Sequence, residues 1–119
     1  MNALSTYTEV SHRSASPEQL VILLYERAIK GQILAIDALE EGDGELAGAE
    51  LRRCREIFVE LASALDHEAA PQLAGNLHRL YLWAVRELLR ASRDADPAPL
   101  EGTLEMTETL YGAMKDALS

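Results

Sequence analysis

The sequence predicts an all-α protein, an antiparallel up-down four-helix bundle preceded by a mobile N-terminal arm. Four segments of helical length are separated by turn-forming residues, and no segment shows the alternation of apolar and polar residues that is typical of a strand. Hydrophobic residues make up 48% of the chain and aromatic residues only 5%. The core must therefore consist mainly of Leu, Ala, Ile and Val, which favours helices. The connections are short, which makes successive helices antiparallel neighbours.

The first helix is expected over about residues 17–39. Ser16 is a suitable N-cap, and Pro17 suits the first helical position;. Gln19 stands three residues after the cap, where a capping box has Glu or Gln. The run 41–44, EGDG, ends this helix, because its two glycines favour a turn;.

Three further helices are expected over about residues 45–65, 71–92 and 100–118. Asp-His-Glu at 66–68 separates the second from the third. The segment 96–99, DPAP, separates the third from the fourth, because each proline disfavours helical geometry in the residue before it.

The first fifteen residues are small and polar, with Leu4, Tyr7 and Val10 as the apolar or aromatic residues that could anchor them. We expect residues 1–15 to form a mobile arm. Residues 16–119 are then expected to form one bundle domain, because the chain is too short for two comfortable cores.

The chain is strongly acidic, with 11 Lys and Arg against 20 Asp and Glu and a formal charge of −9. This charge repels phosphate backbones and predicts no nucleic-acid partner. Four arginines do follow one side of the third predicted helix. We interpret them as a solvated face that balances the Glu-rich segment 101–108. They are Arg79, Arg86, Arg90 and Arg93.

The lone Cys54 cannot form an internal disulfide, and the N-terminus lacks the charged and apolar regions of a signal peptide;. We therefore expect a protein of the cytoplasm. No stretch reaches 18 uninterrupted apolar residues, so no membrane insertion is expected.

The residue types of known catalytic and metal sites are not arranged in a usable pattern. Glu-x-x-His spacing occurs only at 9–12, in the predicted arm, which does not fit a di-iron bundle;. Cys54, His12, His67 and His78 are too scattered for a zinc site. We predict no enzyme, metal or cofactor, a partly buried structural role for His78, and a core position for Cys54.

Two of the predicted helices are more apolar than a bundle core requires. At 100° per residue, the apolar arc of the first helix spans roughly 220° and that of the third roughly 200°, against the stripe of about 100° that core packing uses. Leu20, Leu24, Ala28 and Ala35 are the expected core stripe of the first helix. Trp83 falls on the opposite, arginine-rich side of the third helix.

This surplus has two interpretations. The two helices are central ones, wrapped by the arm and the fourth helix, or they form a groove for an amphipathic helix from another protein or a second copy. The helical wheel gives eight candidate groove residues: Val21, Ile22, Tyr25, Ile29 and Ile33 of the first helix, and Leu82, Val85 and Leu89 of the third.

Several short motifs, in order, resemble those of the FliS-type flagellar export chaperones. Tyr7 stands nine residues before Ser16, and the family's Thr-Ala-Ser-Pro appears as Ser14-Ala15-Ser16-Pro17, followed by Leu23-Leu24-Tyr25 and Ala28-Ile29. The segment 54–61, CREIFVEL, is similar to the family's Ala-x-x-Ile-Ile-x-Glu-Leu. Residues 76–83, NLHRLYLW, resemble its Asn-Leu-x-x-Leu-Tyr-x-aromatic. Departures are Glu26-Arg27 after Tyr25, His12 and Met114.

The resemblance implies a four-helix bundle that binds the C-terminal segment of flagellin through apolar contacts, keeps it from polymerising, and delivers it to the flagellar export gate. It also implies that the N-terminal arm covers the empty groove, with Tyr7 as the cap. The alternative is a structural helical protein that pairs with itself through the same surface. A weak homodimer of the unliganded chain is compatible with both.

Overall fold

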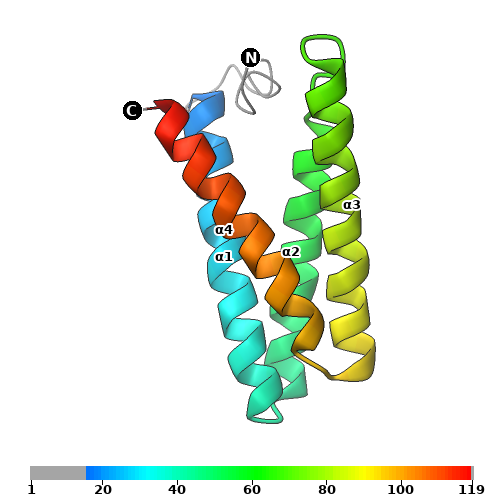
Figure 1. Cartoon of the computed structure of the whole chain (residues 1–119). Coiled ribbons are helices and arrows are strands. Elements are labelled where there is room, and N and C mark those ends of the chain that lie inside the picture. The colour runs from blue at the N-terminus through cyan, green and yellow to red at the C-terminus, as the bar shows by residue number, and fades with distance from the viewer. Residues whose placement is uncertain (1–15, 119) are drawn as a thin grey trace.

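The computed structural model describes residues 16–118, and the regular structure of these residues is entirely helical (Figure 1). The predicted all-α four-helix bundle is confirmed. The predicted arm, residues 1–15 with Tyr7, lies outside the described residues. The helices are α1 (Pro17–Glu40), α2 (Gly44–Ser63), α3 (Pro71–Asp94) and α4 (Ala98–Leu118).

The first two helices begin with side-chain caps, as the sequence predicts. The Gln19 backbone N–H donates to Ser16 Oγ at 3.1 Å, and Gln19 Oε1 accepts from the Ser16 N–H at 3.3 Å, which completes the capping box;. Asp43 caps α2 by accepting from the Leu46 N–H at 3.1 Å. Gly42 has φ +77°, a left-handed conformation that favours glycine, and it closes the turn between α1 and α2;.

The later boundaries differ from the predicted ones by about two residues. The side chain of Asp66 accepts hydrogen bonds at 3.0 Å from the backbone N–H groups of both Glu68 and Ala69, within the connection that follows α2. α4 begins at Ala98 instead of residue 100, because Asp96 accepts from the Ala98 N–H at 3.0 Å. Pro99 is tolerated there, since the first turn of a helix needs no N–H donor from it.

Each helix contacts its two neighbours in the order α1, α2, α3, α4 and back to α1, so α1 and α3 lie diagonally opposite. Figure 1 shows that α4 runs obliquely. It starts beside the C-terminal end of α3 and finishes beside the N-terminal part of α1.

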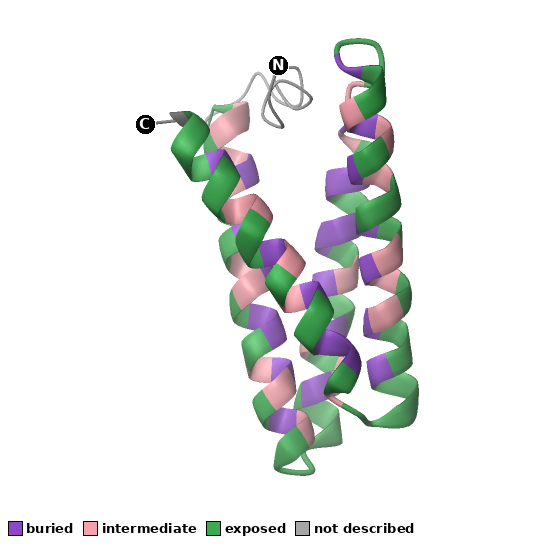
Figure 2. Ribbon diagram, viewed as in Figure 1, coloured by how far each residue is buried: buried purple, intermediate pink, exposed green. Residues whose placement is uncertain are grey.

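The core lies along the inward faces of all four helices, which are purple in Figure 2. On α1 the buried stripe is rotated from the predicted one. Ala28 and Ala35 are buried as expected, but Leu20 and Leu24 are only half-buried. The rotation follows from the two neighbours of α1. α2 approaches α1 closely at Gly31, and α4 covers the side of α1 that carries Gln32. The buried α1 residues are Val21, Tyr25, Ala28, Gly31, Gln32, Ala35 and Ala38.

The approach of α2 to α1 depends on Gly31. A Cβ at this position would lie 2.6 Å from Cys54 Sγ, so only glycine fits without movement. Cys54 is fully buried, as predicted, and its thiol donates to the Ala28 carbonyl at 3.6 Å. A partly buried ion pair between Arg27 and Glu50, at 2.8 Å, lies beside this contact.

α4 is joined to α1 by a buried polar contact. Gln32 Nε2 donates to Thr107 Oγ1 at 3.0 Å, and Thr107 Oγ1 in turn donates to the Thr103 carbonyl at 2.6 Å. α4 also covers Trp83 of α3. A Cβ on Gly102 would lie 3.4 Å from the Trp83 ring. Trp83, expected on the arginine-rich side opposite the apolar arc of α3, is thus half-buried, because the fourth helix packs on that edge of α3.

Candidate functional site

Two of the predicted groove residues, Val21 and Tyr25, are not on the surface. Both side chains are completely or almost completely buried in the core. Their assignment to an accessible groove is corrected for this reason. The wide apolar arc of α1 packs against α2, against α4 and into the bundle centre. Val21 and Tyr25 face the centre.

The polar end of Tyr25 is also satisfied inside the protein. Its hydroxyl lies 2.5 Å from the hydroxyl of Tyr81, so the two form a buried hydrogen bond across the bundle. Burial raises the pKa of Tyr25 well above its usual value of 10.0, and Tyr81 raises it further;. Tyr25 therefore remains a neutral core residue throughout the physiological range.

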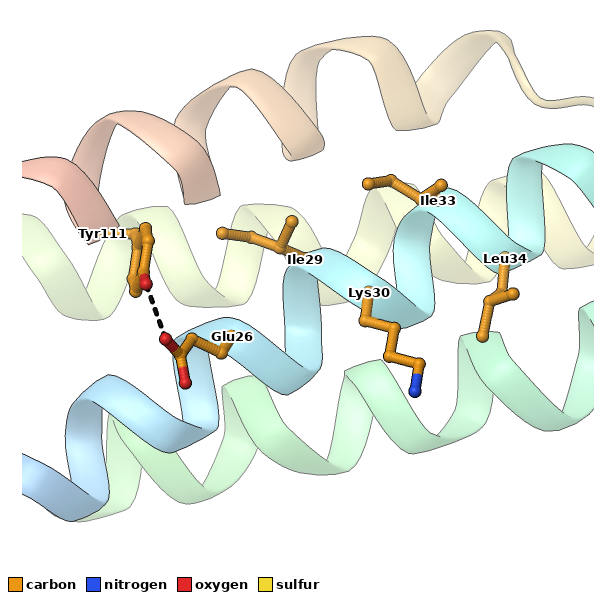
Figure 3. A pocket seen from close by; sticks show the side chains of 6 residues that line it. All are labelled: Glu26, Ile29, Lys30, Ile33, Leu34 and Tyr111. Carbon is orange, nitrogen blue, oxygen red and sulfur yellow. Dashed lines mark hydrogen bonds between the residues drawn. The ribbon is translucent and has the colours of Figure 1, made fainter.

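The other three α1 candidates lie near the surface. Ile22 and Ile29 are half-buried, and Ile33 keeps 43% of its surface exposed. A cavity of about 350 Å³ opens beside two of them, with Tyr111 of α4 at its edge (Figure 3). Its lining is Glu26, Ile29, Lys30, Ile33, Leu34 and Tyr111.

The edge of this cavity carries fixed polar groups. Tyr111 projects from α4 toward Glu26, and its hydroxyl donates to the Glu26 carboxylate at 2.6 Å (Figure 3). The ammonium of Lys115 lies 5.3 Å from the centre of the Tyr111 ring, within cation–π range;. An acidic and a basic group thus flank one aromatic ring at the rim of an apolar hollow.

A second cavity, of about 470 Å³, lies further along the same pair of helices. Ile36 of α1 and Leu104 of α4 supply its largest apolar groups, and three glutamates of α4 are among its other lining residues. Ile36 follows Ile33 by three residues, so it extends the same edge of α1. We call the two cavities together the α1/α4 groove. Its apolar residues are Ile29, Ile33, Leu34, Ile36, Leu104 and Tyr111.

The three α3 candidates lie elsewhere. Leu82 and Leu89 are exposed and Val85 is half-buried. α4 meets α3 at Trp83, and at 100° per residue the three candidates lie between about 100° and about 160° round the helix from that residue;. Since α1 and α3 are diagonal, the expectation of one groove that combines residues from both helices is corrected. The candidates fall on two separate surfaces.

A comparison with known protein families agrees with this four-helix architecture. A sequence model described as "Flagellar protein FliS" matches residues 1–118.

The chain belongs to the FliS family.

Several similar proteins carry the name flagellar secretion chaperone FliS. The protein from Vibrio cholerae is 30% identical over 115 residues, which cover 93% of this chain and 85% of the relative. The one from Salmonella typhimurium is 32% identical and covers 96% and 88%. The one from Bacillus subtilis is 27% identical and covers 98% and 86%. These relatives are named as chaperones, which is a non-enzymatic role.

The residues that α4 adds to the groove of this FliS-family chain were missed in the sequence. α4 has an ordinary apolar content, so Leu104 and Tyr111 do not stand out as apolar residues beyond those that the core requires. Their seven-residue spacing places both on one side of the helix and could have drawn attention to them. Glu26, one of the departures noted in the sequence, lines the groove as well.

No group of three or more potential metal ligands occurs among the described residues of the FliS-family chain. None of the described helices is long and apolar enough to cross a membrane. His78 is half-buried, as predicted, and its ring meets the edge of the His67 ring at 5.8 Å between centroids.

Proposed function

We propose that this chain is a cytoplasmic chaperone that binds the C-terminal segment of flagellin, keeps it from polymerising and delivers it to the flagellar export gate, without a catalytic step. We place the bound segment in the α1/α4 groove. The names of the relatives give the class of function. The observation that carries the proposal is the apolar groove itself, with Ile33, 43% exposed, among its lining residues.

An apolar hollow between two helices suits an amphipathic helical segment. Such a segment would bury the exposed parts of Ile29, Ile33 and Leu104, and hydrophobic burial would supply the affinity;. The charged groups at the rim, Glu26 and Lys30, would orient the segment without much effect on affinity. The net charge of −9 would keep the complex soluble;.

A direct test is a calorimetric titration of the full chain with a synthetic peptide of the flagellin C-terminal segment. We expect one peptide per chain, and hydrogen exchange should slow in the part of α1 around Ile29 and Ile33 and in α4 around Leu104. Absence of binding, or protection confined to α2 and α3, would contradict the proposal. A stable dimer that ignores the peptide would favour the self-pairing alternative.

We further propose that Tyr7 covers the groove when no cargo is bound. An aromatic ring with a polar tip suits such a cap. The Tyr7→Ala variant should then bind the peptide more tightly, because no cap has to be displaced. Unchanged affinity would remove Tyr7 from the proposal and leave the groove itself unaffected.

A further inference from the structure

The outer side of α3 carries a stripe of alternating arginines and leucines. Its spacing is three, four, three and four residues, which keeps all five side chains on one line along the helix. All five residues are exposed. We call them the Arg/Leu stripe: Arg79, Leu82, Arg86, Leu89 and Arg93.

The stripe is positively charged on an otherwise acidic protein. Glu87 and Asp94 are the only acidic residues of α3, against four arginines, whereas Lys115 is the only basic residue of α4, against four acidic ones. Arg86, at the centre of the stripe, forms no ion pair with any of the described residues. Arg93 pairs only with its exposed neighbour Asp94, a contact that contributes little and can be exchanged;.

The stripe also keeps unusual apolar surface in contact with solvent. Leu82 and Leu89 are 36% and 48% exposed. At 100° per residue they lie about 100° and about 120° round α3 from Trp83, where α4 packs;. Val59 of α2, 48% exposed, lies on the side of its own helix opposite the contact of Cys54 with α1. α2 and α3 therefore both carry apolar side chains that the bundle leaves in contact with solvent.

We propose that the Arg/Leu stripe binds an acidic amphipathic helix of a second protein, separately from the cargo in the α1/α4 groove. Alternating three and four spacing is the pattern by which one helix packs along another. Leucines of the partner would pack beside Leu82 and Leu89, and its glutamates or aspartates would pair with Arg79, Arg86 and Arg93. The proposal does not rest on the identity of the cargo.

Other occupants fit the stripe less well. An anionic membrane would attract the arginines but would be repelled by a chain of charge −9, and two leucines supply little apolar area for insertion;. A second copy could offer its acidic α4, but two copies of charge −9 repel each other. A single acidic helix would contact mainly the positively charged stripe, so the net charge of the chain opposes it less than it opposes a whole membrane or a second copy.

The test uses two helical peptides of about three heptads each, with Leu at the a and d positions. One carries Glu at the flanking positions, and the other carries Lys instead. Fluorescence anisotropy should show binding of the Glu peptide to the full chain, and backbone chemical shifts should change around Leu82 and Leu89. The net charge alone would favour the Lys peptide, so the opposite preference is diagnostic of the stripe.

Matched variants locate the contact. Arg86→Glu should weaken binding of the Glu peptide by about fivefold or more, and Leu89→Asp should abolish it. Arg53→Glu makes the same charge change on an exposed part of α2 outside the stripe and should change affinity less than about twofold;. Circular dichroism should show all three variants folded.

Several results would overturn the proposal. They are tighter binding of the Lys peptide, an affinity for the Glu peptide that Arg86→Glu leaves unchanged, or chemical-shift changes confined to the α1/α4 groove. Binding to phosphatidylserine vesicles that Arg86→Glu abolishes would assign the stripe to lipid, and self-association lost in Arg86→Glu would assign it to a second copy. Ile33→Asp should leave the Glu peptide bound while Arg86→Glu leaves the flagellin peptide bound, so the two proposals can fail separately.

Discussion

The hydroxyl oxygens of Tyr25 and Tyr81 lie 2.5 Å apart and join two helices whose backbones do not approach each other closely. α1 and α3 are diagonal in the bundle, so this hydrogen bond crosses its centre. Phe58 of α2 packs beside it, with its ring centroid 6.1 Å from that of Tyr81. The pair fixes the separation of the two diagonal helices within an apolar core.

The Tyr25→Phe substitution should lower the free energy of unfolding by about 1–2 kcal/mol, because it removes this buried hydrogen bond without changing the packing volume. Urea denaturation measures the loss. In a double-mutant cycle with Tyr81→Phe, we expect the two changes to be non-additive. Strict additivity would show that the two hydroxyls do not stabilise one another.

Stability should fall in alkaline solution. Burial raises the pKa of Cys54 from 9.0 to about 12 and that of Tyr25 well above 10.0. Well below pH 9.0 both groups are protonated in the folded and the unfolded chain, so neither makes stability depend on pH. Above these values only the unfolded chain releases the protons, so the free energy of unfolding falls, by up to about 1.4 kcal/mol per pH unit for each group.

Urea denaturation at several pH values measures this dependence. Cys54→Ala should flatten the curve from pH 9.0 upward, and Tyr25→Phe should flatten it only above 10.0. A stability that does not change between about pH 8 and about pH 11 would contradict the burial of both groups.

Cys54 should resist alkylation in the folded protein. The thiol is buried, and its raised pKa leaves almost no thiolate at neutral pH;. Iodoacetamide should modify it only in denaturant, as mass spectrometry can measure. Rapid modification of the native chain would mean that α1 and α2 separate readily at this point.

The Gly31→Ala substitution should destabilise the bundle by about 1–3 kcal/mol, since the added methyl group would overlap Cys54 Sγ and force α1 from α2;. Gly48→Ala is the matched control. A Cβ there meets nothing within 4 Å, so alanine should stabilise α2 by up to about 1 kcal/mol;. Thermal unfolding of the two variants should show opposite shifts, and shifts of the same sign would count against the close approach.

Much of the fold could be predicted from local sequence signals. Ser16 and Gln19 form the expected capping box, glycines end α1 where expected, and Pro97 lies in the connection before α4 as expected. Boundaries that depend on side-chain turns were less predictable. Asp66 and Asp96 redirect the backbone through hydrogen bonds, and their residue types alone do not specify those bonds.

The candidate site could be predicted only in part, because a helical wheel does not say where the neighbouring helices lie. It identified α1 as unusually apolar, yet Val21 and Tyr25 face the centre while Ile29 and Ile33 border the groove. It also joined residues of α1 and α3 that the bundle places diagonally. The α4 side of the groove depends on the oblique path of that helix, which periodicity does not reveal.

The most direct test of the proposed cargo site compares two aspartate substitutions on α1. Ile33 lies in the groove with 43% of its surface exposed, and Leu23, 56% exposed, lies outside it. Neither change should unfold the bundle. In calorimetric titrations with the flagellin C-terminal peptide, Ile33→Asp should weaken binding by at least about tenfold, a loss of about 1.4 kcal/mol, and Leu23→Asp should leave the affinity unchanged. Equal affinities for the two variants, or a loss confined to Leu23→Asp, would contradict the assignment of the cargo to the α1/α4 groove.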